Sequence, residues 1–317
     1  MELRFNSPAM QILTVHHVTS YHYDRPVRFG EHALMMRPRD SHDLRMLEAS
    51  LSVSPAATTR WTHDVFGNSV ARVEFLEEAD HLHVESTIRI EHYGLAEPDF
   101  STLEPYARSL PFPYNSNEVA DLGRCMERHY TDPQHRITEW ARQFMNGSVV
   151  DTGETLIAMN GAVRDTFFYE TREAHGTQTP TETLDRGTGS CRDFALFFME
   201  AVRSLGLGAR FVSGYLYDPA MDAALKDPTL PQGADLRGAG ATHAWVQVYL
   251  PGAGWVEFDP TNGIAGGANL IRVAVARDPA QASPVTGSYY GPPEAFRSLE
   301  IFVEVNGELT PGILTGT

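Results

Sequence analysis

The sequence contains only two cysteines, Cys125 and Cys191, among its 317 residues. One disulfide at most can form, so a disulfide-stapled fold is excluded, and sparing use of cysteine is typical of a reducing compartment. Long apolar segments are also missing: the densest run, residues 194–202, is interrupted by Glu200 and falls well short of the roughly 20 residues of a membrane-spanning helix. The first residues show neither the basic nor the apolar segment of a secretory signal. We therefore expect a cytoplasmic protein.

Cationic side chains are few: 25 Lys and Arg face 41 Asp and Glu, which gives a formal net charge of −16. Such a charge repels phosphate backbones and anionic lipids, so we expect neither a nucleic acid nor a membrane as partner. Hydrophobic residues make up 42% of the chain and aromatic residues 10%. This composition is sufficient for a sizeable core, and the length indicates a folded protein of two domains.

The N-terminal part of the chain has the pattern of β-strands. Residues 70–76 and 83–93 alternate apolar and polar side chains with a period of two, as in a half-buried antiparallel sheet. Short segments rich in β-branched and aromatic residues, separated by turn residues, extend this pattern over residues 10–95. We predict an N-terminal antiparallel β domain there, followed by a helical connector over residues 96–150.

The pattern changes in the second half of the chain. Residues 155–167 carry apolar side chains at helical spacing, and a second helix is expected after Thr183. We predict an α+β domain over residues 151–280 and a C-terminal tail over residues 281–317. Within the tail, residues 298–305 alternate like a strand that returns to one of the two sheets. The strands expected in the α+β domain cover residues 209–217, 243–250, 254–258 and 273–275.

Cys191 follows a glycine-rich turn and stands at the head of a predicted helix, in the run GTGSCRDF of residues 187–194. The partial positive charge and the unpaired N–H groups of a helix N-terminus favour a thiolate, which is the nucleophilic form of cysteine. The same N–H groups can hold a developing oxyanion, so the arrangement suits acyl transfer. The helix is predicted to be amphipathic and to end at Gly206 and Gly208. Its apolar stripe consists of Phe194, Phe197, Phe198, Ala201, Val202 and Leu205.

A base and an orienting group are available downstream of the cysteine. His243 begins the predicted strand THAWVQVY of residues 242–249, and Asp259 lies at the end of the next strand, in WVEFDPTN of residues 255–262. The PGAG segment between them is typical of a turn. In such a hairpin the two side chains lie side by side, so that Asp259 can accept a hydrogen bond from one imidazole nitrogen while the other faces Cys191.

These motifs resemble the bacterial transglutaminase-like family. The resemblance rests on the GxGxCxDF run around Cys191, on SGYL at residues 213–216, on HAWV beginning at His243 and on DPTN beginning at Asp259. The core motifs extend from about residue 155 to 278, and the β domain resembles the N-terminal region that often precedes this core. The implied fold is a papain-like Cys-His-Asp core, in which the helix bearing the cysteine packs on an antiparallel sheet bearing the histidine and the aspartate.

The resemblance also implies a thiol acyltransferase or hydrolase that acts on a protein or peptide without a cofactor. Cys191 would attack an amide carbonyl, His243 would transfer the proton and Asp259 would orient His243. Water or an amine would then resolve the thioester. Trp245 and Tyr215 would line the cleft, and the backbone N–H of the cysteine would bind the oxyanion.

Other polar residues have simpler interpretations. Asp193 is more typical of a helix cap and dipole partner than of a catalytic acid. Cys125 has no histidine close by in its helix-like segment and is taken as structural. His81, His83 and Glu85 share one face of a strand, so chelation is geometrically possible, but a polar strand face is the simpler interpretation and we expect no metal there.

Residues 218–240 form an insertion between strands, rich in Pro, Gly and Asp. Their composition predicts a surface loop, and because the loop directly precedes His243, it either overhangs a site built around that residue or is a plain solvated loop. Asp218, Asp222 and Asp227 lack the spacing of an EF-hand, so we expect no calcium requirement.

Three functions remain open. We favour hydrolysis, which would make the protein a cysteine peptidase or amidase. A lysine amine as acceptor would instead make it a protein-glutamine γ-glutamyltransferase. The third hypothesis is a non-catalytic binding module in which the β domain recruits a protein partner. The oligomeric state is open as well, since exposed edge strands of the β domain would permit a dimer.

Overall fold

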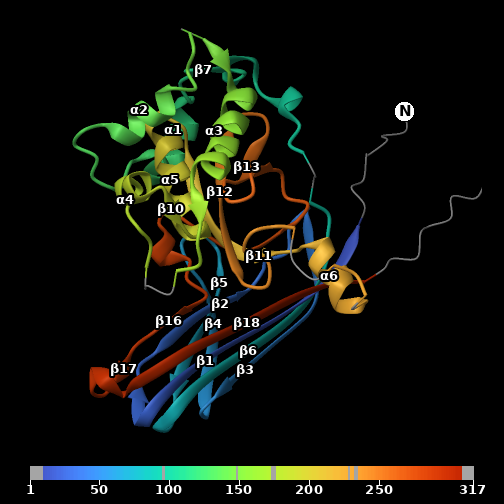
Figure 1. Ribbon diagram of the computed structural model, residues 1–317, viewed down its shortest axis with the longest axis vertical. Helices are drawn as coiled ribbons and strands as arrows, with labels where there is room; N and C mark the ends of the chain where they lie inside the picture. Colours follow the sequence, from blue (N-terminus) through green and yellow to red (C-terminus); the bar gives the residue numbers. More distant parts are fainter. Residues whose placement is uncertain are drawn as a thin grey trace, which may run out of the picture.

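Two antiparallel sheets form the elongated lower half of the molecule in Figure 1. The computed structural model describes residues 10–94, 97–147, 149–172, 176–227, 229–231 and 235–308. One sheet has the strand order β17-β1-β6-β3 with β18 also paired to β1, and the other has the order β16-β2-β5-β4. A cluster of apolar side chains from both sheets, including Val27, Leu34, Val73 and Leu82, fills the space between them. The strands are β1 (Gln11–Phe29), β2 (His32–Arg37), β3 (Leu44–Ser54), β4 (Ala57–His63), β5 (Ser69–Phe75), β6 (Ala79–His92), β16 (Val285–Thr286), β17 (Tyr289–Tyr290) and β18 (Phe296–Glu308).

The long strands of this region follow the alternation in the sequence. Burial alternates residue by residue along most of β6, because one face of the sheet packs inward and the other does not. Strand β1 pairs with β6 on one side, with Leu13 opposite Ile90, and with β18 on the other, with Val15 opposite Val305. The strand predicted in the C-terminal tail therefore returns to the N-terminal sheet.

The upper half of Figure 1 contains a further antiparallel sheet, of order β14-β13-β12-β11-β15, covered by helices. The α+β fold predicted from the sequence is confirmed: α5, which begins at Cys191, packs on β12 and β11. The strands are β11 (Ala209–Leu216), β12 (Thr242–Leu250), β13 (Gly254–Asp259), β14 (Ile264–Ala265) and β15 (Leu270–Ala276), with the short pairs β7 (Ser109–Leu110) and β8 (Val150–Asp151), and β9 (Phe168–Tyr169) and β10 (Thr188–Gly189).

Six α-helices lie in the described part of the chain, and none of them has both the length and the hydropathy needed to cross a membrane. They are α1 (Ser116–Leu122), α2 (Arg136–Arg142), α3 (Thr152–Thr166), α4 (Pro180–Arg186), α5 (Cys191–Ser204) and α6 (Pro219–Lys226). Short 3-10 helices cover Phe100–Thr102, Pro105–Ala107, Gly123–Met126, Pro279–Gln281 and Pro293–Ala295.

Helix α5 lies at the centre of the α+β half of the molecule, and it is buried on more sides than the predicted apolar stripe covers. The helix buries 12 of its 14 residues, because α2, α4 and the connector cover the side that faces away from the sheet. It ends as predicted, with Gly206 in a left-handed conformation just beyond Leu205. Full burial explains why the charged residues Glu200 and Arg203 of this helix need partners inside the protein.

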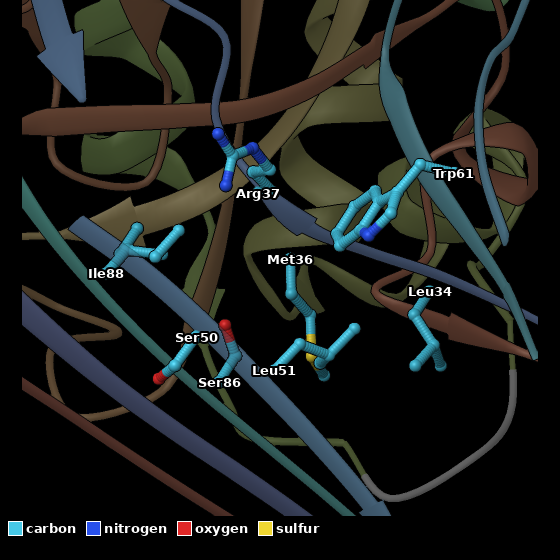
Figure 2. Close-up of a pocket in the computed structure, with 9 residues that line it drawn as sticks. Leu34, Met36, Arg37, Ser50, Leu51, Trp61, Ser86 and Ile88 are labelled. Carbon is cyan, nitrogen blue, oxygen red and sulfur yellow. The ribbon is translucent and has the colours of Figure 1, made fainter. Parts of the chain in front are cut away.

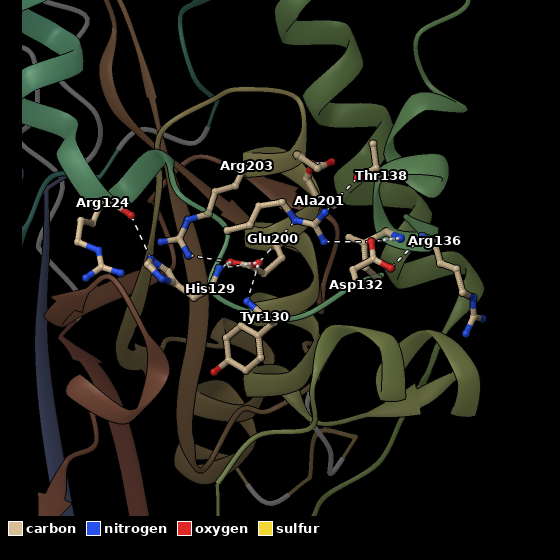
Figure 3. A network of polar contacts seen from close by, with 12 residues as sticks. Arg124, His129, Tyr130, Asp132, Arg136, Thr138, Glu200, Ala201 and Arg203 are labelled. Carbon is tan, nitrogen blue, oxygen red and sulfur yellow. Dashed lines mark hydrogen bonds and ion pairs between the residues drawn. The ribbon is translucent and has the colours of Figure 1, made fainter. Parts of the chain in front are cut away.

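Glu200 and Arg203 form a buried ion pair at 2.9 Å, with both side chains at 0% exposure (Figure 3). Glu200 also accepts from the backbone N–H groups of His129 and Tyr130. Arg203 donates to three carbonyl oxygens, those of Cys125, Ala209 and Arg277. The pair thereby ties the connector and the sheet to α5, and the Cys125 segment takes part in it through its backbone.

Alanine at Glu200 is expected to lower the free energy of unfolding by about 3–5 kcal/mol, since it leaves the buried Arg203 charge without its carboxylate. Alanine at Glu127 is the matched control: its ion pair with Arg124 is more than half exposed on both sides. The control should lose less than about 1 kcal/mol. Urea unfolding of the two variants measures both values, and equal losses would contradict the role given to the pair.

The insertion over residues 218–240 is not the simple loop that its composition predicts. Its first part is the helix α6, which Asp218 caps by accepting from the N–H groups of Ala220 and Met221, with Pro219 in the first turn. The prediction missed this helix because Pro and Asp, taken as loop residues, are also favoured where a helix begins. Residues 228 and 232–234 of the insertion lie outside the described residues.

The two halves pack against each other through a continuous apolar cluster. Leu13 and Val303 of the N-terminal sheet belong to this cluster together with Ile271 and Val273 of β15. In addition, the Asn68 side chain accepts from the N–H of Val275 and donates to its carbonyl.

A small cavity lies in the N-terminal sandwich beneath Trp61 (Figure 2). Leu34, Met36, Leu51 and Ile88 line it, and its volume of about 30 Å³ is close to that of a single water molecule. This cavity is a packing gap and is too small for a substrate.

Candidate active site

Cys191 is the first residue of α5 and is 7% exposed. The turn before it is fixed by β10, whose Gly189 pairs with Tyr169 of β9 in a parallel bridge. Gly189 is required there, since a Cβ at this position would lie 2.9 Å from the Cβ of Asp193. The N–H groups of the first turn of a helix have no acceptor in a preceding turn. The sulfur therefore stands beside hydrogen-bond donors and the positive end of a buried helix.

Asp193 holds this turn in place. Its carboxylate is fully buried and accepts from the N–H and hydroxyl of Ser190, from the N–H of Gln178 and from the guanidinium of Arg172 at 2.9 Å. Burial alone would raise the pKa of Asp193, but Arg172 and the N–H donors hold it below its ordinary value. Asp193 is thus a cap, as the sequence predicts, and also the centre of a polar cluster that the sequence did not indicate.

The hairpin of β12 and β13 brings His243 and Asp259 together. Val246 lies opposite Phe258 in the register, and the Nε2 atom of His243 lies 2.9 Å from a carboxylate oxygen of Asp259. The carboxylate also accepts from the N–H of Thr261 and from the Asn262 side chain. His243 is 1% exposed and Asp259 is 0% exposed. Asn262 is the last residue of the DPTN motif, but the sequence alone does not indicate its contact with the Asp259 carboxylate.

The second ring nitrogen of His243, Nδ1, is buried and has no hydrogen-bond partner within the described residues. Burial alone would lower the pKa of His243, but the charge and hydrogen bond of Asp259, together with the neighbouring Cys191 thiol, raise it to about 10. The pKa of Asp259 is correspondingly held below its ordinary value despite burial. A protonated imidazole next to a thiol stabilises the thiolate form.

Asparagine at Asp259 is expected to lower the pKa of His243 well below 10, because burial, which lowers it, is then no longer offset by the Asp259 charge. The raised pKa means that protonated His243 stabilises the fold fully below about pH 6.5, and that this contribution is lost as the pH rises through 10. An NMR titration of the ring measures the shift, with Asp185→Asn, at an exposed carboxylate, as the control. An unchanged titration in Asp259→Asn would contradict the pairing.

The last part of the insertion lies against His243. A Cβ at Gly238 would lie 2.8 Å from His243 Nδ1 and 3.5 Å from the hydroxyl of Tyr169. Asn262 holds this segment by accepting from the N–H of Arg237 at 2.8 Å and donating to its carbonyl. The interpretation that the insertion overhangs His243 is therefore confirmed at Gly238.

Two regions of the chain match known protein families. Residues 13–91 match the bacterial transglutaminase-like N-terminal region, and residues 138–260 match the transglutaminase-like superfamily. The chain therefore contains a transglutaminase-like core, preceded by the N-terminal region of the bacterial transglutaminase-like type. An uncharacterized protein of Mycobacterium leprae is 24% identical over 92% of this chain and 98% of its own length, and one of Mycobacterium tuberculosis is 27% identical over 87% of each.

A solved structure has the same fold. It is a candidate cysteine protease from Cytophaga hutchinsonii, which superposes with a TM-score of 0.69, covers 96% of this chain and 93% of its own, and is 16% identical. At this identity the likeness concerns the fold, which spans both the N-terminal sandwich and the transglutaminase-like core.

The predicted cleft residues Trp245 and Tyr215 do not line a cleft, since they are 0% and 2% exposed. Trp245 stacks on His243, with ring centroids 6.0 Å apart, and donates to Glu257, so it supports the histidine from behind. The Tyr215 hydroxyl is hydrogen-bonded to Nδ1 of His17 at 2.9 Å, because β11 is packed against the N-terminal sheet. Whether the strand face of Tyr215 is covered depends on how the two halves dock, which the local sequence does not encode.

Proposed function

We propose that the protein is a thiol-dependent amide hydrolase acting on a protein or peptide, with Cys191 as nucleophile, His243 as proton carrier and Asp259 as orienting group. One observation carries the proposal: Nε2 of His243 is hydrogen-bonded to Asp259, its Nδ1 is buried, and the ring lies next to Cys191 at the head of α5. A nucleophile, a base and a third group that orients the base are the elements of acyl transfer through a covalent intermediate.

The proposed reaction begins from a thiolate–imidazolium pair, in which the proton of Cys191 is held on Nδ1 of His243, and the sulfur attacks the amide carbonyl carbon. The oxyanion that forms is stabilised by N–H groups in the first turn of α5. His243 then protonates the leaving nitrogen as the C–N bond breaks, which leaves a thioester. Water, deprotonated by His243, attacks the thioester; the C–S bond breaks, the sulfur regains the proton and a carboxylic acid is released.

Burial favours water over an amine as the acceptor. Cys191, His243 and Asp259 are 7%, 1% and 0% exposed, and Gly238 lies against the imidazole. Water reaches such a centre more easily than the long side chain of a protein-bound lysine. The chain itself offers a single lysine, Lys226, which is engaged with Asp222 and with the backbone of β18.

Peptide mixtures incubated in water labelled with heavy oxygen test both acceptors at once. The full chain, with an added alkylamine and with Cys191→Ala as control, is expected to give new carboxylates that carry the heavy oxygen. Amine adducts in place of labelled carboxylates would favour the transglutaminase reaction. Products that persist in Cys191→Ala would contradict the proposed nucleophile.

A further inference from the structure

A cavity of about 290 Å³ opens beside the candidate active site. It lies between the C-terminal end of α3, strand β9 and the segment before β12. Its wall includes Tyr169, whose strand partner Gly189 is two residues before Cys191. A Cβ at Gly238 would lie 3.5 Å from the Tyr169 hydroxyl and 2.8 Å from Nδ1 of His243, so Tyr169 lies close to the candidate site. Burial and the nearby Cys191 raise the pKa of Tyr169 to about 12. The residues that line the cavity are Arg164, Asp165, Thr166, Phe167, Phe168, Tyr169 and Arg237.

The two arginines of this cavity are held by the turn that orients Asp259. The backbone N–H of Arg237 donates to the side-chain oxygen of Asn262, and the Asn262 side-chain amide donates to the carbonyl of Arg237 and to the Asp259 carboxylate. The guanidinium of Arg164 packs on the next residue of that turn, since a Cβ at Gly263 would lie 3.1 Å from its Nη1. The guanidinium of Arg237 donates to the carbonyl of Arg164 at 3.3 Å. Both positive charges are therefore positioned relative to the active site.

The charged side chains that line the cavity, two arginines and one aspartate, leave a net positive charge. Asp165 pairs with Arg164 through Nε at 2.7 Å, while Arg237 has no ion-pair partner among the described residues. One positive charge remains in the wall of a cavity on a chain whose net charge is −16. Beside it, Phe168 is 77% exposed and offers an apolar surface to whatever enters.

We propose that this cavity, the Arg164–Arg237 pocket, is a substrate subsite that binds a carboxylate of the peptide whose amide Cys191 attacks. The inference rests on the proposed function and names its substrate class: a peptide with an acidic group a short distance from the scissile amide. A guanidinium binds a carboxylate through charge-assisted hydrogen bonds and fixes its orientation. Phe168 packs against the aliphatic part of the same segment. The carboxylate comes either from an Asp or Glu side chain or from the C-terminus of the peptide.

Protection of Cys191 from alkylation tests the subsite without a known substrate. The probes are peptidyl α-ketoamides, which place residues on both sides of the carbonyl that the sulfur attacks. One series carries Glu or Gln at each position in turn, and a second ends in a free carboxylate or an amide. Each probe is added to the full chain before iodoacetamide, and the unmodified fraction of Cys191 is read by intact mass at low ionic strength.

One acidic probe is expected to protect about tenfold better than its amide counterpart, and the series in which it occurs identifies the source of the carboxylate. Arg237→Gln should abolish the difference between the acidic and the amide probes, because it removes the guanidinium and leaves the backbone contacts of residue 237 with Asn262 in place. Asp165→Asn should increase the preference. Arg60→Gln, at an exposed position on β4 of the N-terminal sandwich, is the control and should leave it unchanged.

Two different failures are distinguishable. If Cys191 reacts rapidly with iodoacetamide but acidic and amide probes protect equally, or if Arg237→Gln retains the preference, the subsite assignment is wrong. If Cys191 of the wild-type chain does not react rapidly even without a probe, the proposed function itself fails, and with it the substrate class derived from it.

Discussion

Alanine at Cys191 or at His243 is expected to lower kcat/KM for an amide substrate by about 10⁴-fold or more, which is the loss found when the nucleophile or base of a catalytic triad is removed. The reason is structural. The His243–Asp259 hydrogen bond and the helix N-terminus at Cys191 are both preformed in a buried site, so each alanine removes a group that no neighbour can replace. The rate of heavy-oxygen incorporation into peptides measures the loss.

Cys125→Ser is the matched control for this prediction. Cys125 lies in a 3-10 helix of the connector and contributes its carbonyl, not its sulfur, to the Arg203 network. Its serine variant should keep full activity. Residual activity within about tenfold of the wild type in Cys191→Ala or His243→Ala, with unfolding midpoints intact, would show that the chemistry lies elsewhere.

Alanine at Asp193 is expected to reduce the free energy of unfolding by about 3–5 kcal/mol, well beyond the loss of an ordinary helix cap. The carboxylate is fully buried and is the shared acceptor for Arg172, Gln178 and Ser190. Its removal leaves a guanidinium that is 16% exposed without its counter-charge. Because the same cluster fixes the turn before Cys191, thiol reactivity should fall as well.

Urea unfolding measures the stability of Asp193→Ala, and Asp185→Ala provides the control. Asp185 is paired with Arg136 in an ion pair whose carboxylate side is 56% exposed, so its alanine variant should lose less than about 1 kcal/mol. Asp193→Asn should lie between the two, because the amide oxygen still accepts from Gln178. A loss in Asp193→Ala no larger than that of the control would mean that the cluster does not hold the turn.

Local patterns in the sequence were enough to predict most of the elements around the candidate site. The strands that carry His243 and Asp259 alternate or form short apolar runs bounded by turn residues, and the hairpin between them follows from the PGAG turn. The head of α5 was predicted from the glycine-rich turn and from the apolar stripe that follows Cys191. Such features involve residues close together in the chain, so single-sequence reasoning detects them.

Contacts between distant segments could not be predicted in the same way. The ion pair of Glu200 with Arg203 is local, but its need for partners arises because α2 and the connector cover α5. Likewise Tyr215 was assigned to the cleft from its neighbourhood in the chain, whereas the docking of the N-terminal sheet turns it toward His17. The contact of Gly238 with His243 depends on where a long insertion returns to the core.

Competition between the two cysteines of one molecule for sub-stoichiometric iodoacetamide, near neutral pH, tests the central claim most directly. Burial raises the pKa of Cys125, which makes it a slow internal reference. If Cys191 is activated by His243, intact mass and peptide mapping will show rapid, selective labelling of Cys191 that is lost in His243→Ala. Slow labelling of Cys191, or labelling mainly at Cys125 in the wild type, would contradict an assembled Cys191–His243–Asp259 centre.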